Sequence, residues 1–464
     1  MDLSQTSARD LVNAISAGML SAETLMQHTL DRIEAVNGAA NAIVALRDAD
    51  DLLTEARALD AGSNRGALHG LPIAVKDLAN VEGIVSSQGS PIFQNHVPKR
   101  DDLIAARMRA AGAILIGKTN TPEFGLGSHT FNPVYGATGN PYDPSRTSGG
   151  SSGGAAVALA TGMVALADGS DMMGSLRNPA AWNNVYGFRP SWGRVPSEPV
   201  GDGYLHQLST LGPMARSPED LGLLLDVISG PDPRQPNGND GPAVSPVQAA
   251  DLRGVRIGWL DDWGGAYPFE GGIRELCREA LSVFTQLGAE VVPVAAPFEA
   301  EQMWDSWIAL RSWSIAAGLA PLTEHRATLK DTAQWELDRG LSMTAMQVHR
   351  ASVIRTGWFR RATELMRDFD ALVLPSAQVW PFEIETPYPK EIAGKKMDTY
   401  HRWMEVMVPV SLIGLPCLSV PVGFGANGLP MGMQLFGPRG TDAHILSIGE
   451  AYHLATRWPQ KRPA

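Results

Sequence analysis

Three short segments of the sequence hold one lysine and two serines that could carry out acyl transfer without a histidine. Lys76 lies in the apolar run LPIAVKDLA, Ser151 in the glycine-rich segment GGSSGGAA, and Ser175 in SDMMGSLRNPA. A serine hydroxyl becomes a nucleophile when a nearby base takes its proton, and a neutral lysine amine can be that base. The residue types therefore indicate a Ser–Ser–Lys arrangement for attack on a carbonyl carbon.

Lys76 is the unusual member of this set, because a lysine within an apolar run must find a partner or reach water. Burial disfavours the charged ammonium and lowers its pKa, which leaves a neutral amine able to accept a proton. The alternative is that Lys76 extends to solvent or pairs with Asp77, although neighbouring side chains of a strand point to opposite faces. The residue types alone leave both interpretations open.

The glycine-rich segment around Ser151 leads directly into the apolar stretch AAVALATGMVALA, residues 155–167, which we expect to form a helix between the two serines. Glycine and serine richness usually means a flexible linker, but a segment joined to core material is expected to be fixed in place. Ser175 could simply cap a short helix beginning at Leu176. The same geometry would aim consecutive backbone N–H groups at an anionic oxygen.

Two familiar motifs overlap or neighbour these segments, and physical arguments speak against both. Residues 112–119 satisfy the phosphate-loop pattern G-x-x-x-x-G-K-T, but the middle Ala-Ile-Leu-Ile is typical of a strand and Pro122 interrupts a following helix, so Lys118 is expected to be structural. Residues 150–154 satisfy the G-x-S-x-G nucleophile elbow, which needs a buried strand before the serine and a late histidine. The preceding NPYDPSRTSG is typical of a polar loop, and His444, the main candidate, of a helix face.

Helical and strand-like segments alternate along the chain, which predicts an α/β protein. Residues 1–60 show helical periodicity, and Ser217 is expected to cap a helix that begins with a proline. Residues 300–366 look wholly helical, and residues 230–246 are the best linker candidate. The expected strands are residues 71–78, 113–117, 255–260, 290–296, 370–377 and 418–424, and further helices are expected at residues 101–112 and 273–287.

Composition indicates an ordinary globular protein and argues against several functional classes. The chain has 464 residues, 44% of them hydrophobic and 19% charged, and its net charge of −11 argues against general affinity for nucleic acid or anionic membranes. Cys277 and Cys417 are expected to be reduced and buried, and the 10 histidines form no metal-binding motif. Neither a signal peptide nor a membrane-spanning run is apparent, so we expect a cytoplasmic protein.

Taken together, the motifs resemble the amidase signature family, whose core runs as GGSSGG, an apolar helix and a G-S-x-R nucleophile loop. LPIAVKDLANVEG is similar to the family's lysine strand, AGAILIGKTNTPEFG to its next signature, and LIGLPCLSVPVGFGANGLPMGMQLFGP to its C-terminal block. The resemblance implies an α/β fold with a single large mixed β-sheet sandwiched by helices. It implies one domain over residues 1–464, with N-terminal helices at 1–60, a catalytic core at 68–229, a variable, largely helical substrate-side region at 230–370, and a C-terminal block at 371–455 that completes the sheet.

The resemblance also implies a role for each residue of the site. Ser175 is the expected nucleophile, Ser151 in a cis peptide bridges it to Lys76, and neutral Lys76 is the base that later returns the proton to the leaving amine. Water would then hydrolyse the acyl-enzyme, with no cofactor and no metal. The oxyanion hole would be formed by the backbone amides of Met172, Met173, Gly174 and Ser175.

One departure from the family pattern concerns Met172 and Met173, which stand where small residues are usual. A positive φ at Met173 would strain the backbone, whereas a negative φ would leave both thioether side chains free to line an apolar acyl pocket. We expect the second case, and hence a small apolar or aryl carboxamide, or a carbamate or ester, as substrate. Five tryptophans could add to the apolar wall or belong to the core: Trp304, Trp307, Trp313, Trp335 and Trp358.

Two other functions stay open on the sequence alone. One is the glutaminase-type subunit of a tRNA-dependent amidotransferase, a family relative that would need partner subunits and a polar pocket for glutamine. The other is a non-catalytic relative that binds an apolar ligand. For the favoured amidase we expect a small-molecule amide or carbamate as partner, neither nucleic acid nor membrane, and a monomer or homodimer.

Overall fold

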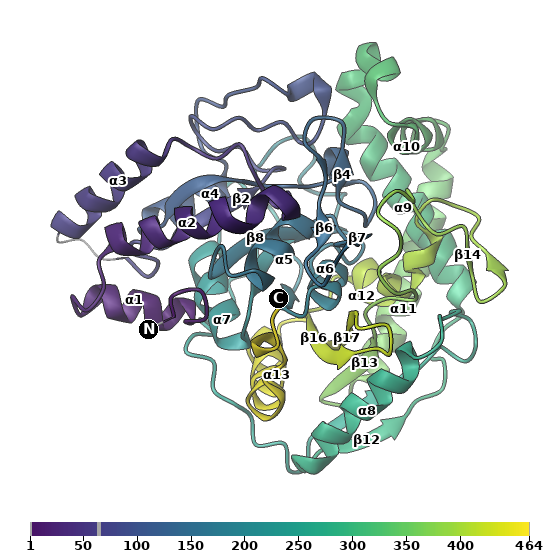
Figure 1. Cartoon of the computed structure of the whole chain (residues 1–464). Helices are drawn as coiled ribbons and strands as arrows, with labels where there is room; N and C mark the ends of the chain where they lie inside the picture. Colours follow the sequence, from purple (N-terminus) through teal and green to yellow (C-terminus); the bar gives the residue numbers. More distant parts are fainter. Residues whose placement is uncertain (1, 63–65, 464) are drawn as a thin grey trace.

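The computed structural model describes residues 2–62 and 66–463 (Figure 1). A mixed β-sheet of 8 strands runs through it in the order β12-β11-β13-β17-β16-β9-β10-β8. Its first three strands are parallel and every other neighbouring pair is antiparallel, so the predicted large mixed sheet is confirmed. In sheet order the strands are β12 (Glu290–Pro293), β11 (Arg256–Trp259), β13 (Ala371–Pro375), β17 (Pro430–Phe436), β16 (Cys417–Phe424), β9 (Tyr186–Arg189), β10 (Thr210–Ala215) and β8 (Leu166–Asp171).

Lys76 lies in a smaller sheet of 3 strands that adjoins the large one. It contains β1 (Ile43–Val44), β3 (Ile114–Thr119) and β2 (Pro72–Lys76), and β2 and β3 are parallel and buried throughout, as expected for apolar runs of this length. β2 lies beside β8, the edge strand of the large sheet, where the Lys76 N–H donates to Asp168 Oδ1 at 2.9 Å. This contact places Lys76 beside β8, the strand that leads into the turn holding Ser175.

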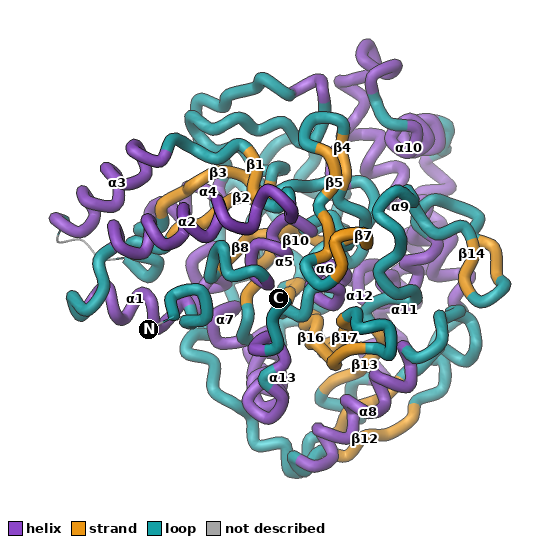
Figure 2. Tube along the Cα trace, viewed as in Figure 1, coloured by secondary structure: helices purple, strands orange, loops and turns teal. Residues whose placement is uncertain are grey.

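Helices cover the sheets. Figure 1 shows α1 (Ala8–Ser16), α2 (Ala22–Ala40) and α3 (Ala49–Ala61) on one side of the molecule and α9 to α11 on the other, and Figure 2 shows the strands between them. No helix within residues 2–62 and 66–463 is long and apolar enough to cross a membrane. The remaining α-helices are α4 (Leu103–Ala110), α5 (Gly153–Ala160), α6 (Arg177–Trp182), α7 (Pro218–Ile228), α8 (Ile273–Gln286), α9 (Ala300–Leu319), α10 (Asp331–Leu341), α11 (Ala345–Leu365), α12 (Val408–Ile413) and α13 (Asp442–Thr456).

The helical prediction for residues 300–366 is confirmed. This region forms α9, a 3-10 helix (Ala320–Thr328), α10 and α11, and α9 packs against both α10 and α11. Three of its tryptophans, Trp304, Trp307 and Trp358, are buried in the core. Two further predictions are also confirmed: the Ser217 side chain caps α7 by accepting from the Asp220 N–H, and Cys277 and Cys417 are buried free thiols.

The prediction of one long helix over residues 155–167 is wrong. Only α5 is helical, because the chain takes a left-handed turn at Gly162, where φ is +75°, directly after the helix ends. The apolar residues that follow form β8, which pairs with β10 and is buried in the sheet. Small and apolar residues thus occur both in α5 and at the start of β8. Hydrophobic periodicity therefore does not show where the helix ends and the strand begins.

The predicted polar loop before Ser151 is also corrected, because its residues form β7 (Asp143–Thr147), which pairs with β6 (Gly139–Asn140). β7 is largely accessible to solvent, so the buried strand that a nucleophile elbow requires is missing here, and His444 lies on α13 as predicted. Two further hairpins are β4 (Phe131–Asn132) with β5 (Gly136–Ala137) and β14 (Glu391–Ile392) with β15 (Lys395–Lys396).

The phosphate-loop pattern at residues 112–119 is a strand, as predicted, because β3 occupies its middle residues. The Lys118 side chain is fully buried, and its ammonium donates to the carbonyl of Ala79 and to Ser86 Oγ. Lys118 therefore has the structural role that the sequence predicted.

Candidate active site

The Lys76 side chain is buried at the end of β2 and lies among three serine hydroxyls. Its Nζ is 2.7 Å from Ser151 Oγ, 2.9 Å from Ser152 Oγ and 3.0 Å from Ser170 Oγ. Lys76 and Ser151, two members of the predicted set that lie 75 residues apart in sequence, are therefore in direct contact. Ser152 and Ser170 were not predicted, although Ser152 directly follows Ser151 and Ser170 lies two residues before Met172.

Burial makes a neutral Lys76 amine accessible near neutral pH. Burial lowers the pKa of Lys76 to about 7, and the nearby Asp168 and Asp171 carboxylates only partly oppose this shift. The alternative that Lys76 pairs with Asp77 is wrong, because Asp77 points away and accepts hydrogen bonds from Ser87 N–H and Ser87 Oγ. When Lys76 is neutral, its lone pair accepts a hydrogen bond from one of the three surrounding hydroxyls.

Ser151 follows a cis peptide bond to Gly150, as the family resemblance implied. The chain around it is fixed, because Ser128 Oγ donates to the Gly150 carbonyl at 2.6 Å and α5 begins two residues after Ser151. The Ser151 hydroxyl is buried and faces both Lys76 and a cavity. The segment is thus a rigid part of the core and not a linker.

Ser175 lies in the turn between β8 and α6 and lines the same cavity as Ser151. The turn is tied to the glycine-rich segment, since the Ser152 N–H donates to the Ser175 carbonyl at 3.3 Å. Within the described chain, Ser175 Oγ makes no hydrogen bond, so the predicted bond between Ser175 and Ser151 is not formed in this structure. Hydrogen bonds of this kind are often long without substrate and tighten when it binds.

The backbone of residues 172–175 partly fits the predicted oxyanion hole. Gly174 takes the positive φ, at +86°, and Met173 does not, so the strain considered at Met173 is absent. The Gly174 N–H, however, donates to Asp171 Oδ1 at 2.8 Å, so this amide already has an acceptor within the turn, and its part in the oxyanion hole stays a prediction. Among the residues that the structure describes, the amides of Met172, Met173 and Ser175 have no such partner.

Asp171 holds this turn in place and was not predicted as a site residue. Its buried carboxylate accepts from the Gly174 and Leu176 amides, at 2.8 and 3.2 Å, and from the Arg177 and Arg189 guanidiniums. These two positive charges hold the pKa of Asp171 well below its usual range, although burial opposes them. The arginine of the G-S-x-R motif, Arg177, was the available signal, because a buried guanidinium requires a carboxylate partner.

The cavity beside Ser175 is small, about 90 Å³, and both apolar and polar side chains line it. A second cavity of about 490 Å³ adjoins it and shares Met172 and Ser209 with it, so Met172 stands between the two. None of the five tryptophans lines the cavity beside Ser175, and Trp304, Trp307 and Trp358 belong to the core, which was the other possibility left open. The small cavity is lined by Leu78, Phe124, Gly125, Leu126, Gly127, Ser151, Ser170, Met172, Met173, Ser175, Ser209, Arg311, Ile315 and Met404.

Comparisons with known proteins agree with this geometry. The Amidase family model matches residues 24–446. The chain is 30% identical to an acylamidase from Rhodococcus erythropolis, over 99% of this chain and 97% of that protein, and 34% identical to a glutamyl-tRNA(Gln) amidotransferase subunit from Thermus thermophilus, over 97% of each. The crystal structure of a bacterial aryl acylamidase superposes with a TM-score of 0.92 at 30% identity, covering 99% of both chains.

Fold and relatives together define an enzyme that hydrolyses amides, acting on carbon–nitrogen bonds. The chain belongs to the amidase signature family.

Proposed function

We propose that the chain hydrolyses small apolar or aryl carboxamides by Ser–Ser–Lys acyl transfer, with Ser175 as nucleophile. The observation that carries this proposal is the 2.7 Å contact between Lys76 Nζ and Ser151 Oγ at the wall of a cavity that Ser175 also lines. A buried amine with a pKa of about 7 is a competent base at neutral pH. No other described group in contact with Ser151 can take this part.

The proposed reaction has two halves. In the first, Ser175 Oγ attacks the carbonyl carbon while its proton passes through Ser151 to Lys76. The free backbone amides of Met172, Met173 and Ser175 bind the oxyanion that forms. The carbon–nitrogen bond then breaks, and Lys76 returns the proton through Ser151 to the leaving amine. In the second half, water attacks the acyl-enzyme with the same base and releases the acid and Ser175.

The substrate class follows from the walls of the cavity. Leucine, isoleucine, phenylalanine and methionine side chains line part of the cavity beside Ser175, which favours an acyl group with an apolar chain or aryl ring in contact with them. Because a carbamate or an ester presents the same electrophilic carbonyl, either could react at this site. We further propose that the enzyme acts on these small molecules in the cytoplasm, as a monomer or homodimer.

Glutamine hydrolysis in a tRNA-dependent amidotransferase is the second candidate, since the chain is 34% identical to the Thermus thermophilus amidotransferase protein. Free glutamine carries an α-ammonium as well as an α-carboxylate, and a buried site for it needs a carboxylate partner. None of the described residues that line the catalytic cavity is an aspartate or glutamate. This favours a substrate without an ammonium group.

A fluorophosphonate probe tests the proposed nucleophile. We expect one adduct, mapped to Ser175, in the purified chain, and none in Ser175→Ala, because the probe needs an activated hydroxyl. Ser282→Ala, which removes an exposed serine on α8, is the control and should be labelled like the wild type. A folded chain that resists the probe would favour the non-catalytic alternative, and glutamine turnover that requires a partner protein, with no aryl-amide turnover, would overturn the proposed substrate.

The pH dependence of the reaction tests the proposed base. Since only the neutral amine accepts a proton and the pKa of Lys76 is about 7, kcat/KM for an aryl amide should fall about tenfold per pH unit below pH 7 and level off above it. The burial of His129 lowers its pKa to about 4, so this histidine cannot produce such a limb. Near-UV circular dichroism over the same range would show that the chain stays folded, and a flat profile would contradict the role of Lys76.

A further inference from the structure

One charged side chain, that of Arg311, stands among the otherwise uncharged described residues that line the catalytic cavity. Arg311 belongs to α9 and is 4% exposed, so its guanidinium is almost completely removed from bulk water. The proposed chemistry at Ser175 gives it no part. A buried charge beside a reacting centre therefore needs an explanation of its own.

Two neighbours fix the orientation of the guanidinium. Arg311 Nε donates to Glu336 Oε1 at 2.7 Å, and Nη2 donates to Tyr400 Oη at 2.7 Å. The Tyr400 hydroxyl donates in turn to Glu336 Oε1 at 2.8 Å, and Ser312 Oγ donates to Glu336 Oε2 at 2.6 Å. Because every member of this network is buried and bonded, Arg311 has little freedom to turn.

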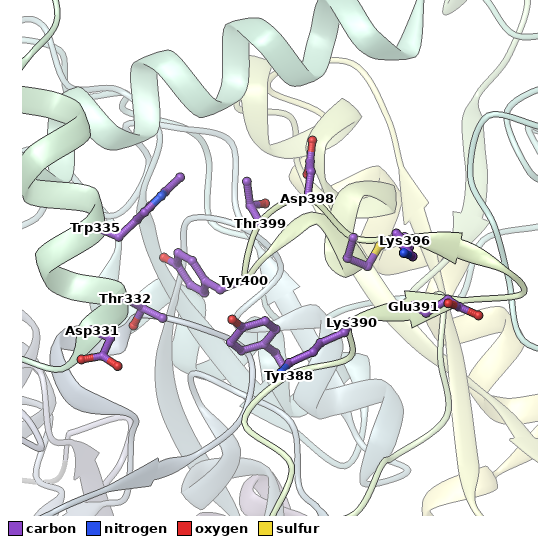
Figure 3. Close-up of a pocket in the computed structure, with 11 residues that line it drawn as sticks. Asp331, Thr332, Trp335, Tyr388, Lys390, Glu391, Lys396, Asp398, Thr399 and Tyr400 are labelled. Carbon is purple, nitrogen blue, oxygen red and sulfur yellow. The ribbon is translucent and has the colours of Figure 1, made fainter.

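Tyr400 is itself held from its other side. Its ring packs edge-on against Trp335, with centroids 5.9 Å apart, and against Tyr388, with centroids 6.3 Å apart. Figure 3 shows these three rings on the wall of a separate cavity of about 600 Å³. Tyr400 thus lies between that outer cavity and Arg311, and its hydroxyl holds the guanidinium in place.

The third nitrogen of the guanidinium is the one that lacks a strong acceptor. Arg311 Nη1 is 3.3 Å from Met172 Sδ, and a thioether sulfur is a weak acceptor for a charged donor. Met172 also lines the catalytic cavity, and its backbone amide is one of the free amides of the turn. A buried ion pair adds little to stability over apolar residues of equal volume, so stability alone does not account for a fixed, incompletely paired arginine here.

We infer that Arg311 is a specificity-determining residue, which binds a hydrogen-bond-acceptor oxygen on the acyl portion of the substrate. This inference rests on the proposed function and narrows the substrate class, from any small acyl group with an apolar chain or ring to one that also carries a ketone or carboxylate oxygen. Such an oxygen takes the place of Met172 Sδ as the partner of Nη1. Burial strengthens this bond, because water does not compete for the donor.

Three para-nitroanilides of similar size test the inference. They are derived from levulinic acid, which has a ketone at C4, from succinic acid, which has a second carboxylate, and from valeric acid, which has neither. The wild type is expected to prefer at least one acceptor substrate over the valeric anilide by about 10- to 100-fold in kcat/KM. A gain for both acceptor substrates would identify any acceptor oxygen as sufficient, and a gain for the succinic anilide alone would identify the carboxylate. Arg311→Met should abolish this preference, so that kcat/KM becomes about equal for the acceptor and valeric anilides.

Two further variants keep the test decisive. Because Arg311→Met leaves Glu336 without its charge partner and can impair folding, the double variant Arg311→Met/Glu336→Gln removes both charges and should lose the same preference. Arg339→Met removes another arginine of this helical region, one that lies over Trp335 and outside the cavity, and should keep the wild-type preference. Equal rates on all three anilides in a wild type that the fluorophosphonate labels, or an unchanged preference in the Arg311 variants, would overturn the inference alone. Absence of labelling would overturn the proposed function and the inference with it.

Discussion

Replacing Lys76 by methionine is expected to lower kcat/KM for an aryl amide by about 1,000-fold or more, while the protein stays folded. The substitution keeps the apolar stem of the side chain and removes the only described base in contact with Ser151. Without that base, neither Ser175 nor the water that attacks the acyl-enzyme can lose a proton efficiently. Steady-state kinetics and the melting temperature together measure the effect.

Lys118→Met provides the matched control for this substitution. Lys118 is a second buried lysine, on the neighbouring strand β3. Its ammonium donates to the Ala79 carbonyl and to Ser86 Oγ, neither of which belongs to the proposed catalytic set. Its replacement should lower the melting temperature and leave the activity of each folded molecule near the wild-type value. A Lys76→Met variant that keeps half of its activity would exclude the proton relay.

The proposed catalytic residues could be predicted because each of them lies in a short, distinctive sequence segment. The lysine strand, the GGSSGG segment and the G-S-x-R turn each restrict the backbone locally, and only their order had to be recognised. The same holds for β3 in place of the phosphate loop, since four apolar residues in a row favour a strand. The family resemblance, more than local sequence, implied which of these residues approach one another. The structure contains the Lys76–Ser151 contact and lacks the Ser151–Ser175 hydrogen bond among the described residues.

The remaining features depend on contacts between distant parts of the chain. Arg311 reaches the site from α9, 139 residues away from Met172, and nothing in the sequence around it marks it for this position. The hydrogen bond from the Gly174 amide to Asp171 likewise depends on where the Asp171 carboxylate points. The end of α5 was missed for a different reason, because apolar residues on both sides of Thr161 and Gly162 are buried in the helix and in the strand alike, so hydrophobicity does not mark the boundary.

Replacing Asp171 by asparagine is expected to destabilise the fold by about 3–5 kcal/mol. The carboxylate lies between the Arg177 and Arg189 guanidiniums, all three side chains are fully buried, and an amide leaves two positive charges without a counter-charge. Asp251→Asn, which breaks an exposed aspartate–arginine pair on the surface, should leave the melting temperature unchanged. Thermal or denaturant unfolding of the three proteins measures the difference.

The same substitution should also slow fluorophosphonate labelling of Ser175 in the molecules that remain folded. Asp171 fixes the turn through the Gly174 and Leu176 amides on either side of Ser175, so its loss moves both the nucleophile and the neighbouring free amides. A variant that is less stable but labels at the wild-type rate would assign Asp171 to stability alone. Slower labelling at a temperature where the variant is fully folded would show instead that the carboxylate, without touching substrate, positions the nucleophile and the oxyanion hole together.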